Sequence, residues 1–304
     1  MTSRSLDTTP ALPEAEDTLI PPHRGGCGDL WVDVGLELTG FPPSPGVYGQ
    51  LLHETEQLRG SGQADLSFFI HKPPGLRWRL HAADGTRLPE LRRAATAAAA
   101  RIVTPDRVRT AVYEPQAALF GGPRSMHLVH RTWSADSALW MRWHARQTPP
   151  SATERWDLSF GVLSRVFVAL GVVGWEDREV WDCVSEDTGR RLAAQEWTRP
   201  QVLAAARSLR SRWDAVWGAS RQQSSAGGGA AAQILHEFSL RADPTLADWY
   251  DLLSRPATRH PLTPRRAAAY WAVFHWNRAG LTAAQQALTA ETLAGMPLGP
   301  ADVG

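Results

Sequence analysis

The chain is poor in the residues that cross-link proteins or anchor them in membranes. Among its 304 residues it has two cysteines, Cys27 and Cys183, and a single lysine, Lys72. The cysteines lie far apart and in no metal-ligand spacing, which favours free thiols over a disulfide framework or a zinc site. No apolar run reaches the roughly 20 residues that cross a bilayer, and the N-terminus lacks the apolar core of a secretory signal. We therefore expect a cytoplasmic protein with no membrane partner.

Net charge and cofactor motifs are also scarce. The formal net charge is +1 at pH 7, so no bulk attraction draws the chain to nucleic acid. The sequence has no glycine-rich phosphate loop, no dinucleotide fingerprint and no spacing of histidines or carboxylates typical of zinc or iron. These absences predict a protein that works without a metal, nucleotide or flavin cofactor and without a nucleic-acid partner.

Tryptophan is the residue in clear excess. The chain has 14 tryptophans, and hydrophobic residues make up 43% of it, enough for a large buried core. Most of the indoles are expected to pack in that core. Some are expected to line a site for flat aromatic groups, because indole rings stack well on such groups.

The first part of the chain alternates strands and helices. Residues 1–28 have no hydrophobic period and are predicted to be disordered. Alternating apolar residues predict four strands, over 31–38, 66–72, 76–81 and 108–114. Helical periods predict helices over 47–59 and 88–103. The order β-α-β-β-α-β is the split-βαβ pattern of a ferredoxin-like sheet, which carries both helices on one face.

The rest of the chain is predicted to be helical. The expected helices cover 139–146, 156–172, 178–192, 200–218, 230–240, 245–253, 263–279 and 283–293. The fold class is thus α+β, with one domain over 29–304. Its ferredoxin-like sheet portion (29–125) is expected to pack its open face against a mostly helical portion (126–295). A cleft between the two portions is the expected place for a functional site.

Four stretches, in this order, carry a family resemblance. They are HKPPGLRWRLH (71–81), YEPQAALFGGPRSM (113–126), TWSADSALWMRW (132–143) and YWAVFHWNRAGL (270–281). Together they resemble the C-terminal elimination domain of lanthipeptide dehydratases and the stand-alone thiopeptide-type bacteriocin biosynthesis proteins. The resemblance runs from about residue 29 to about residue 295. It implies that the partner is a ribosomally made precursor peptide, with a leader and an azole- or dehydroalanine-containing core, together with other biosynthetic enzymes.

The family that these stretches resemble holds at least two chemistries. Eliminases remove glutamate from glutamylated Ser or Thr, whereas pyridine synthases join two dehydroalanines in a formal 4+2 aza-cycloaddition that closes a thiopeptide macrocycle. The eliminase pattern in the second stretch has Glu-x-x-Arg, where this chain has Gln116 and Leu119. Gln cannot act as a carboxylate base, and Leu cannot hold an anionic glutamyl group. The departure therefore favours the pyridine synthase.

The resemblance also implies a set of site residues. The candidates for catalysis, as hydrogen-bond donors or neutral acids, are His275, Arg77, Arg79, Tyr270 and Tyr113. The candidates for substrate binding are His71, Gln116, Ser137, Asn277, Arg278 and Trp271. Structural roles remain open for them, such as a solvated strand face for the arginines, core packing for the tyrosines and an N-cap for the serine. We expect the groups to converge on one pocket with aromatic walls.

The sequence as a whole favours a cofactor-independent peptide cyclase that forms a pyridine ring with loss of water and of the leader peptide. Two alternatives stay open. One is the glutamate-eliminating component of a split tRNA-dependent dehydratase, and the other is a non-catalytic leader-peptide-binding protein. Because a net charge of +1 gives no bulk attraction, the leader is expected to bind in a local groove, hydrophobic with arginines at its rim.

Overall fold

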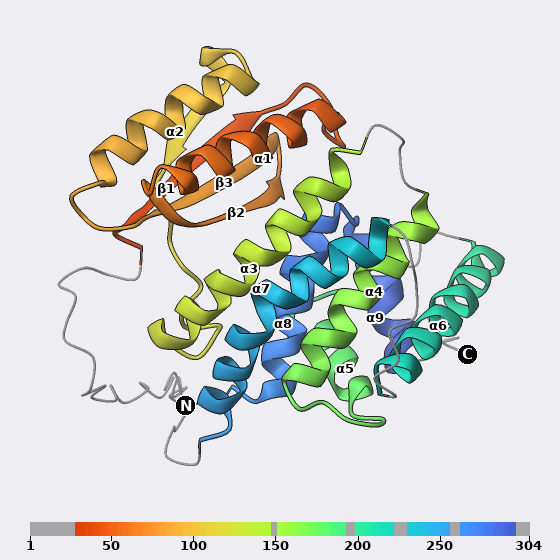
Figure 1. Ribbon diagram of the computed structural model, residues 1–304. Helices are drawn as coiled ribbons and strands as arrows, with labels where there is room; N and C mark the ends of the chain where they lie inside the picture. The colour runs from red at the N-terminus through yellow and green to blue at the C-terminus, as the bar shows by residue number, and fades with distance from the viewer. Residues whose placement is uncertain (1–27, 147–150, 193–197, 222–229, 256–261, 296–304) are drawn as a thin grey trace, which may run out of the picture.

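The structure is a computed structural model that describes residues 28–146, 151–192, 198–221, 230–255 and 262–295. All of the segment predicted to be disordered except Gly28 lies outside these residues, as does Cys27. Figure 1 shows two layers: a small sheet with two helices on its outer face, and a larger helical body beneath it. The predicted α+β fold class is confirmed. No helix in the described part is long and apolar enough to cross a bilayer.

The sheet layer follows the predicted order of elements. Its elements are β1 (Trp31–Glu37), α1 (Pro45–Gly60), β2 (Ala64–Lys72), β3 (Gly75–Ala82), α2 (Leu88–Ile102), the short 3-10 turn η1 (Pro105–Arg107) and β4 (Val108–Ala111). The strand order β2-β3-β1-β4, with every neighbouring pair antiparallel, is the ferredoxin-like arrangement. The fourth strand ends earlier than predicted, because the chain leaves the sheet at the exposed Val112 and turns inward at the buried Tyr113.

Side-chain alternation gives the sheet two different faces. On β3, Leu76, Trp78 and Leu80 are buried, and the indole N–H of Trp78 donates to the Thr55 hydroxyl on α1 at 3.1 Å. These residues therefore face the two outer helices. The arginines between them face the opposite way, toward the helical body.

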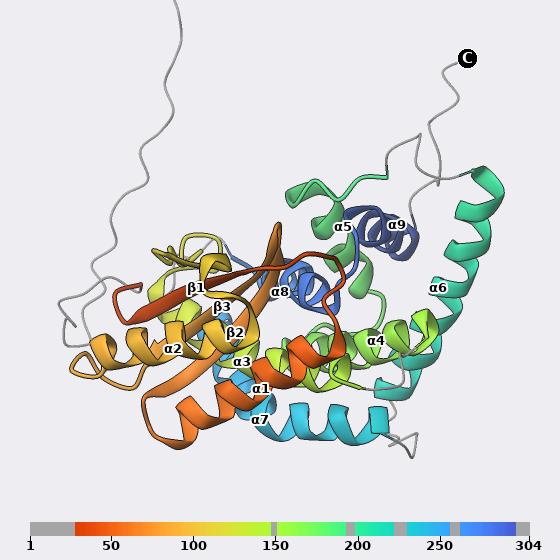
Figure 2. The ribbon, with the colours of Figure 1, turned by 90° about the horizontal axis from the view of Figure 1, so that it is seen from above.

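The helical body holds the remaining elements. They are α3 (Pro123–His144), α4 (Ala152–Ala169), α5 (Asp177–Asp187), α6 (Arg199–Arg221), α7 (Ala230–Leu253), α8 (Pro264–Ala279) and α9 (Ala283–Ala294). Helix α3 lies between the sheet layer and α7 (Figure 1), and Figure 2 shows α6 at the edge of the helical body away from α2. Helices α3 and α8 both contact β2, so the body covers the β2 side of the sheet's inner face.

Helix α3 covers the edge strand β2 with hydroxyl groups. The backbone N–H of Ser67 donates to Ser134 Oγ, and that of Phe69 donates to Ser137 Oγ, both at 3.2 Å. An edge strand otherwise leaves such donors without partners. Ser137, predicted to bind substrate or cap a helix, is fully buried in the middle of α3. It therefore satisfies the sheet edge and caps no helix.

Three of the predicted helices differ clearly from those in the structure. The helix expected over 139–146 is only the C-terminal part of α3, which begins at Pro123 directly after two glycines with positive φ. The buried serines interrupt the apolar period of α3, because they bind the sheet edge. The helices expected over 230–240 and 245–253 are one helix, α7, which continues through Pro244.

Most tryptophans belong to the core. Eleven of the 14 are buried, at positions 31, 78, 133, 140, 143, 181, 213, 217, 249, 271 and 276. Trp197 lies outside the described residues, and Trp156 is partly buried. Among the described indoles only Trp175, at 75% exposure, is largely open to solvent. Few of the described tryptophans are therefore accessible for the expected stacking on flat aromatic groups.

Candidate functional site

Two arginines of β3 lie on the sheet face that is turned toward the helical body. In the register, Arg79 stands opposite Asp33 of β1, and its Nε donates to the Asp33 carboxylate at 2.9 Å. Asp33 is only 3% exposed, so this ion pair is nearly buried. Arg77 reaches the same carboxylate more loosely, with 3.9 Å between its Nη1 and Asp33 Oδ1. The shared partner places both arginines on one face, as their alternation predicted.

A glycine beside Arg77 leaves room for its guanidinium group. Gly35 of β1 pairs with Arg77 on one side and with Arg109 of β4 on the other. A Cβ atom at Gly35 would lie 3.1 Å from Arg77 Nη1, so the guanidinium group lies over the bare glycine. Arg109 is paired with Glu37 at 3.0 Å. Arg77 is therefore the most weakly paired cation of this face.

Aromatic rings hold Arg79 in place. Its guanidinium carbon lies 4.4 Å from the ring centre of Tyr113 and 5.4 Å from that of Phe68, within cation–π range. The Tyr113 hydroxyl is hydrogen-bonded to His130 Nε2 at 2.7 Å. Burial lowers the pKa of His130 to about 3, so its imidazole is neutral at pH 7. Arg79 is thus fixed by one carboxylate and a neutral aromatic wall.

A second polar cluster lies inside the helical body, around His275 of α8. His275 is fully buried, with Nδ1 2.8 Å from Asp136 Oδ1 and Nε2 3.0 Å from Ser159 Oγ. Arg278 Nε donates to the other oxygen of Asp136 at 2.5 Å, while its Nη1 and Nη2 are buried without a hydrogen-bond partner. Burial acts to raise the pKa of Asp136, but His275 and Arg278 outweigh it and hold that pKa below its usual value.

Ser159, His275 and Asp136 are joined in the order of a serine-hydrolase triad. None of these three side chains is accessible to solvent, and the carboxylate is shared with Arg278. A nucleophile has to reach its substrate. In this structure the cluster therefore ties α3, α4 and α8 together, and His275 does not line a surface that a peptide could touch.

A third group of polar residues fastens the end of α8 to the sheet. His71, at the end of β2, donates from Nδ1 to the Asn277 carbonyl at 2.6 Å, and its Nε2 lies 2.6 Å from the Tyr48 hydroxyl. His144 Nε2 donates to the Arg278 carbonyl at 2.9 Å. Burial lowers the pKa of His71 to about 4 and that of His144 to about 3. Both imidazoles are therefore neutral at pH 7 and act as hydrogen-bonding joints.

The remaining predicted residues lie apart from these clusters or support them. The buried indole of Trp271 donates to the Thr132 hydroxyl at 2.9 Å. The Tyr270 hydroxyl donates to the Asp187 carboxylate of α5 at 3.3 Å. Gln116 is exposed in the turn before α3, and its carbonyl accepts from a backbone N–H. Among the described residues no group of histidines, cysteines and carboxylates is arranged to hold a metal ion.

The predicted groups therefore form separate clusters and not one pocket. Two aromatic side chains lie between Arg79 and Arg278. Phe68 lies against Arg79, Trp133 lies against Arg278, and the two rings are 5.3 Å apart. The sheet arginines are partly accessible, at 28% for Arg77 and 13% for Arg79, whereas His275 is enclosed. Of the three clusters described above, the sheet cluster is the one whose charged groups a substrate can reach.

A sequence model of the family described as "Lantibiotic biosynthesis dehydratase C-term" matches residues 47–296 of the chain. The chain belongs to this family. Its fold resembles that of the tRNA dependent lantibiotic dehydratase MibB from Microbispora sp. 107891, with a TM-score of 0.55 and 16% identity over 91% of this chain. It also resembles TsrL, with a TM-score of 0.55 and 14% identity over 87% of this chain and 93% of that chain. The chain spans only 28% of the MibB chain. A search of curated proteins finds no match.

For this member of the lantibiotic dehydratase C-terminal family, sequence reasoning missed the partners that fix the candidate residues. Asp33 is an acidic residue among the apolar residues of the first strand. The register between β1 and β3, which places Asp33 opposite Arg79, identifies its partner. Asp136 is the only acidic residue of α3, a helix with many buried positions, and a carboxylate there indicates that a buried cation is near. His130 gave no signal, because its role depends on Tyr113, which lies on another element.

Proposed function

We propose that the protein is a cofactor-independent peptide cyclase that closes the six-membered nitrogen ring of a thiopeptide precursor. The ring would form by a formal 4+2 aza-cycloaddition between two dehydroalanines, with loss of water and of the leader peptide. The observation that carries the proposal is the charge balance around Arg79. One buried carboxylate, Asp33, compensates it, and its other neighbours are the neutral pair Tyr113 and His130.

Elimination of glutamate would ask for different surroundings. It needs a base to remove the Cα proton and a cation to hold the departing carboxylate. Asp33 is engaged by Arg79, and His130 is a weak base because burial lowers its pKa to about 3. Gln116 and Leu119 stand where the eliminase pattern has its charged pair. Ring closure instead requires two alkenes to be aligned and an amide to be polarised, tasks that neutral donors and fixed arginines can perform.

The roles follow from accessibility. Arg77 and Arg79 would donate hydrogen bonds to the reacting amide, with Tyr113 as a neutral wall beside them. His275, Asn277 and Arg278 would be positioning residues, since they lock α8 against α3 and the sheet without reaching the surface of the Arg77–Arg79 face.

A direct reconstitution tests the proposal. The purified protein is incubated with a precursor peptide that carries thiazoles and two dehydroalanines, with no other protein or additive. Mass spectrometry should detect a macrocycle and a released leader peptide. Arg79→Lys should slow the reaction, because a lysine keeps the charge but lacks the planar fork of donors. A precursor that stays linear would contradict the proposal.

The eliminase remains the second candidate, for one specific reason. The Arg77–Arg79 pair is present, and paired guanidinium groups are suited to an anionic leaving group. This candidate predicts that the protein releases glutamate from a glutamylated peptide, which an enzyme-coupled glutamate assay measures. Substituting either arginine would stop that release.

A further inference from the structure

Most of the large hydrophobic side chains that the protein exposes lie on α4, on α7 or on the turn that follows α4. Eight such side chains are exposed among the described residues, and five of them belong to these elements: Val168, Val173, Trp175, Leu240 and Tyr250. Exposed apolar groups that gather on one surface mark an interaction site, whereas single scattered ones need no explanation. We call the surface formed by these five residues the α4–α7 face.

Helices α4 and α7 lie side by side along this face. A Cβ atom at Gly161 of α4 would lie 3.0 Å from Leu235 Cδ2 of α7. A Cβ atom at Gly171, just after α4, would lie 2.6 Å from Tyr250 Cε2. The carbonyl of Val168 accepts from the Gly171 N–H at 3.0 Å, so Val168 lies one turn from the glycine that Tyr250 covers. The apolar residues of the two helices therefore border one another.

The turn that carries Val173 and Trp175 is held in place. The Trp217 indole N–H donates to the Gly174 carbonyl at 2.9 Å, and the Val173 N–H donates to the Glu176 carboxylate at 2.9 Å. Trp175 is nevertheless 75% exposed. A tryptophan presented to solvent on a fixed turn is the kind of side chain that anchors protein–protein interfaces.

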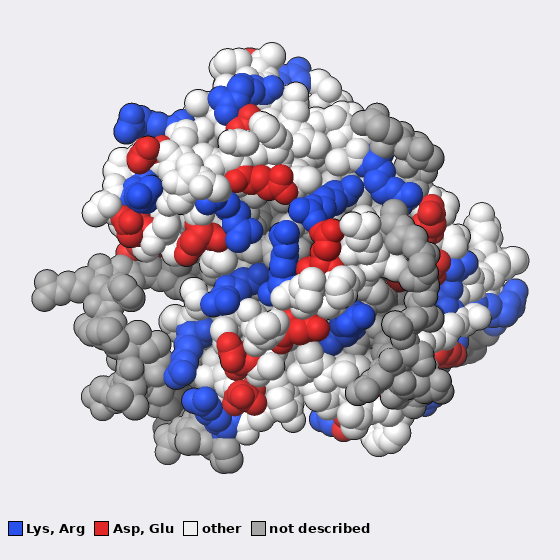
Figure 3. All heavy atoms as spheres, viewed as in Figure 1, with Lys and Arg blue, Asp and Glu red and all other residues white. Residues whose placement is uncertain are grey.

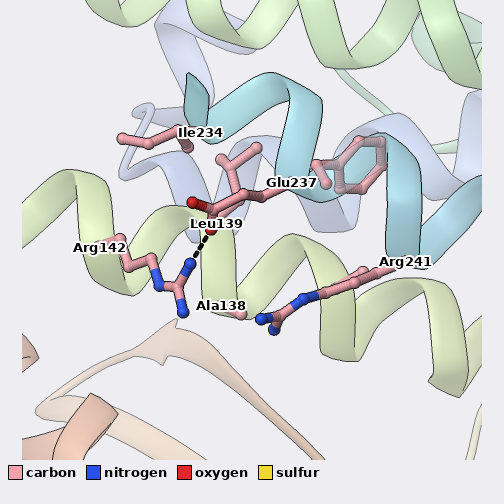
Figure 4. A pocket seen from close by; sticks show the side chains of 8 residues that line it. Ala138, Leu139, Arg142, Ile234, Glu237 and Arg241 are labelled. Carbon is pink, nitrogen blue, oxygen red and sulfur yellow. Dashed lines mark hydrogen bonds and ion pairs between the residues drawn. The ribbon is translucent and has the colours of Figure 1, made fainter. Parts of the chain in front are cut away.

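The exposed residues of α7 form one stripe. Successive members are three, four and three residues apart, so they lie along the same side of the helix: Leu240, Asp243, Ala247 and Tyr250. The flank of α7 next to α3 is already occupied, because Arg142 of α3 forms an ion pair there with Glu237 (Figure 4). The stripe is thus the part of α7 that remains free to meet another molecule.

The stripe is symmetric about Thr245. Leu240 and Tyr250 lie five residues on either side of it, and Asp243 and Ala247 lie two residues on either side. If two copies of α7 pack antiparallel, Leu240 of each copy meets Tyr250 of the other. The small Ala247 then lies opposite Asp243, so the two helices can approach closely.

Opposite charges lie on this face without partners. Arg165 on α4 and Asp243 on α7 are exposed, and neither side chain has an ion pair or a hydrogen bond among the described residues. Arg165 precedes Val168 by three residues, so it lies on the same side of α4. Figure 3 shows the side of the helical body on which α7 lies, where acidic and basic side chains are mixed with uncharged surface between them. A face with one unpaired cation and one unpaired anion is electrostatically complementary to a copy of itself.

We propose that the α4–α7 face joins two copies of this chain in a symmetric dimer. The two α7 helices run antiparallel, with Leu240 of each copy against Tyr250 of the other. Arg165 of each copy pairs with Asp243 of the other, so the same ion pair forms twice. A two-fold interface uses the same patch on both subunits, as this self-complementary face requires. The proposal concerns assembly and holds whichever reaction the protein catalyses.

Sedimentation equilibrium of the purified full chain over about 1–100 µM tests the dimer. The wild type should have twice the 33.4 kDa mass of one chain. Arg165→Asp and Asp243→Arg each place like charges opposite one another, so each should weaken dimerisation at least about ten-fold. The matched controls are Arg92→Asp on α2 and Asp248→Arg on α7, at exposed positions outside the face. Each control should change the dissociation constant less than about two-fold.

An equimolar mixture of Arg165→Asp and Asp243→Arg shows whether the charges act between copies. In a mixed dimer the introduced aspartate faces the introduced arginine, and the native Asp243 of one variant faces the native Arg165 of the other. The mixture should therefore dimerise within about three-fold of the wild type, although each variant alone does not. A wild type that stays monomeric would overturn the proposal and leave the face to a different protein. A dimer that both reversals leave intact would also overturn it, as would a mixture no tighter than the single variants.

Discussion

Removing the buried carboxylate of Asp136 should be among the most damaging single changes to this fold. Asp136→Asn keeps the shape of the side chain but leaves the Arg278 guanidinium with no counter-charge, although both residues are fully buried. Removing one partner of a buried ion pair costs about 3–5 kcal/mol of folding stability. The loss should reach the upper part of that range, because Nη1 and Nη2 of Arg278 already have no partner. A total stability of roughly 5–15 kcal/mol leaves the variant measurable.

Urea unfolding at pH 7, followed by tryptophan fluorescence, measures this loss. Arg278→Met and the double variant Asp136→Asn/Arg278→Met complete a double-mutant cycle, in which the double variant should cost less than the sum of the two single changes. Asp157→Asn is the matched control, since its pair with Arg212 lies at the surface and should be worth less than about 1 kcal/mol. An Asp136→Asn variant within about 1 kcal/mol of the wild type, or strictly additive costs, would show that Asp136 does not stabilise the fold through Arg278.

Three further changes have distinct expected outcomes. The pKa of His144 is about 3 in the fold against 6.5 ordinarily, so the unfolded chain binds more protons between those values. The contribution of His144 should therefore lower the free energy of unfolding by about 2 kcal/mol between pH 7 and pH 5. In urea unfolding, His144→Gln should make the free energy of unfolding depend less on pH over this range. The same pH dependence in the variant and the wild type would contradict the prediction. Gly35→Ala should displace the tip of Arg77 and lower kcat/KM for ring closure about ten-fold with little change in Tm; an unaltered rate would exclude Arg77 from the site. Ser137→Ala should destabilise the fold by about 1–3 kcal/mol, because the Phe69 N–H loses its acceptor. The KM for ring closure should stay constant. A raised KM without destabilisation would instead indicate that Ser137 binds substrate.

The sheet layer was predictable because its signals are local. Alternation over 76–81 fixed which residues of β3 face the outer helices, and the order of elements fixed the ferredoxin-like topology. Helix α3 was harder to predict, because Ser134 and Ser137 are polar positions that face the sheet edge and not solvent. Their burial follows from tertiary contact, which a helical period does not contain.

The candidate site was predictable only in part, for the same reason. Alternation placed Arg77 and Arg79 on one face, but their shared carboxylate depends on the register between strands. The depth of His275 depends on three helices that meet around it. His275 and Arg278 are three residues apart and lie on the same face of α8, as the sequence predicts, but that face is buried in the core. Sequence patterns therefore identified the residues of the clusters but not which of them a substrate can reach.

Offering the same purified protein two substrates in parallel distinguishes a pyridine synthase from an eliminase most directly. One is a thiazole-containing precursor with two dehydroalanines, and the other is a precursor glutamylated on serine. Mass spectrometry follows macrocycle and leader release from the first, and a coupled assay follows free glutamate from the second. A pyridine synthase should close the ring of the first substrate and release no glutamate from the second. Glutamate release without ring closure would contradict the proposed function.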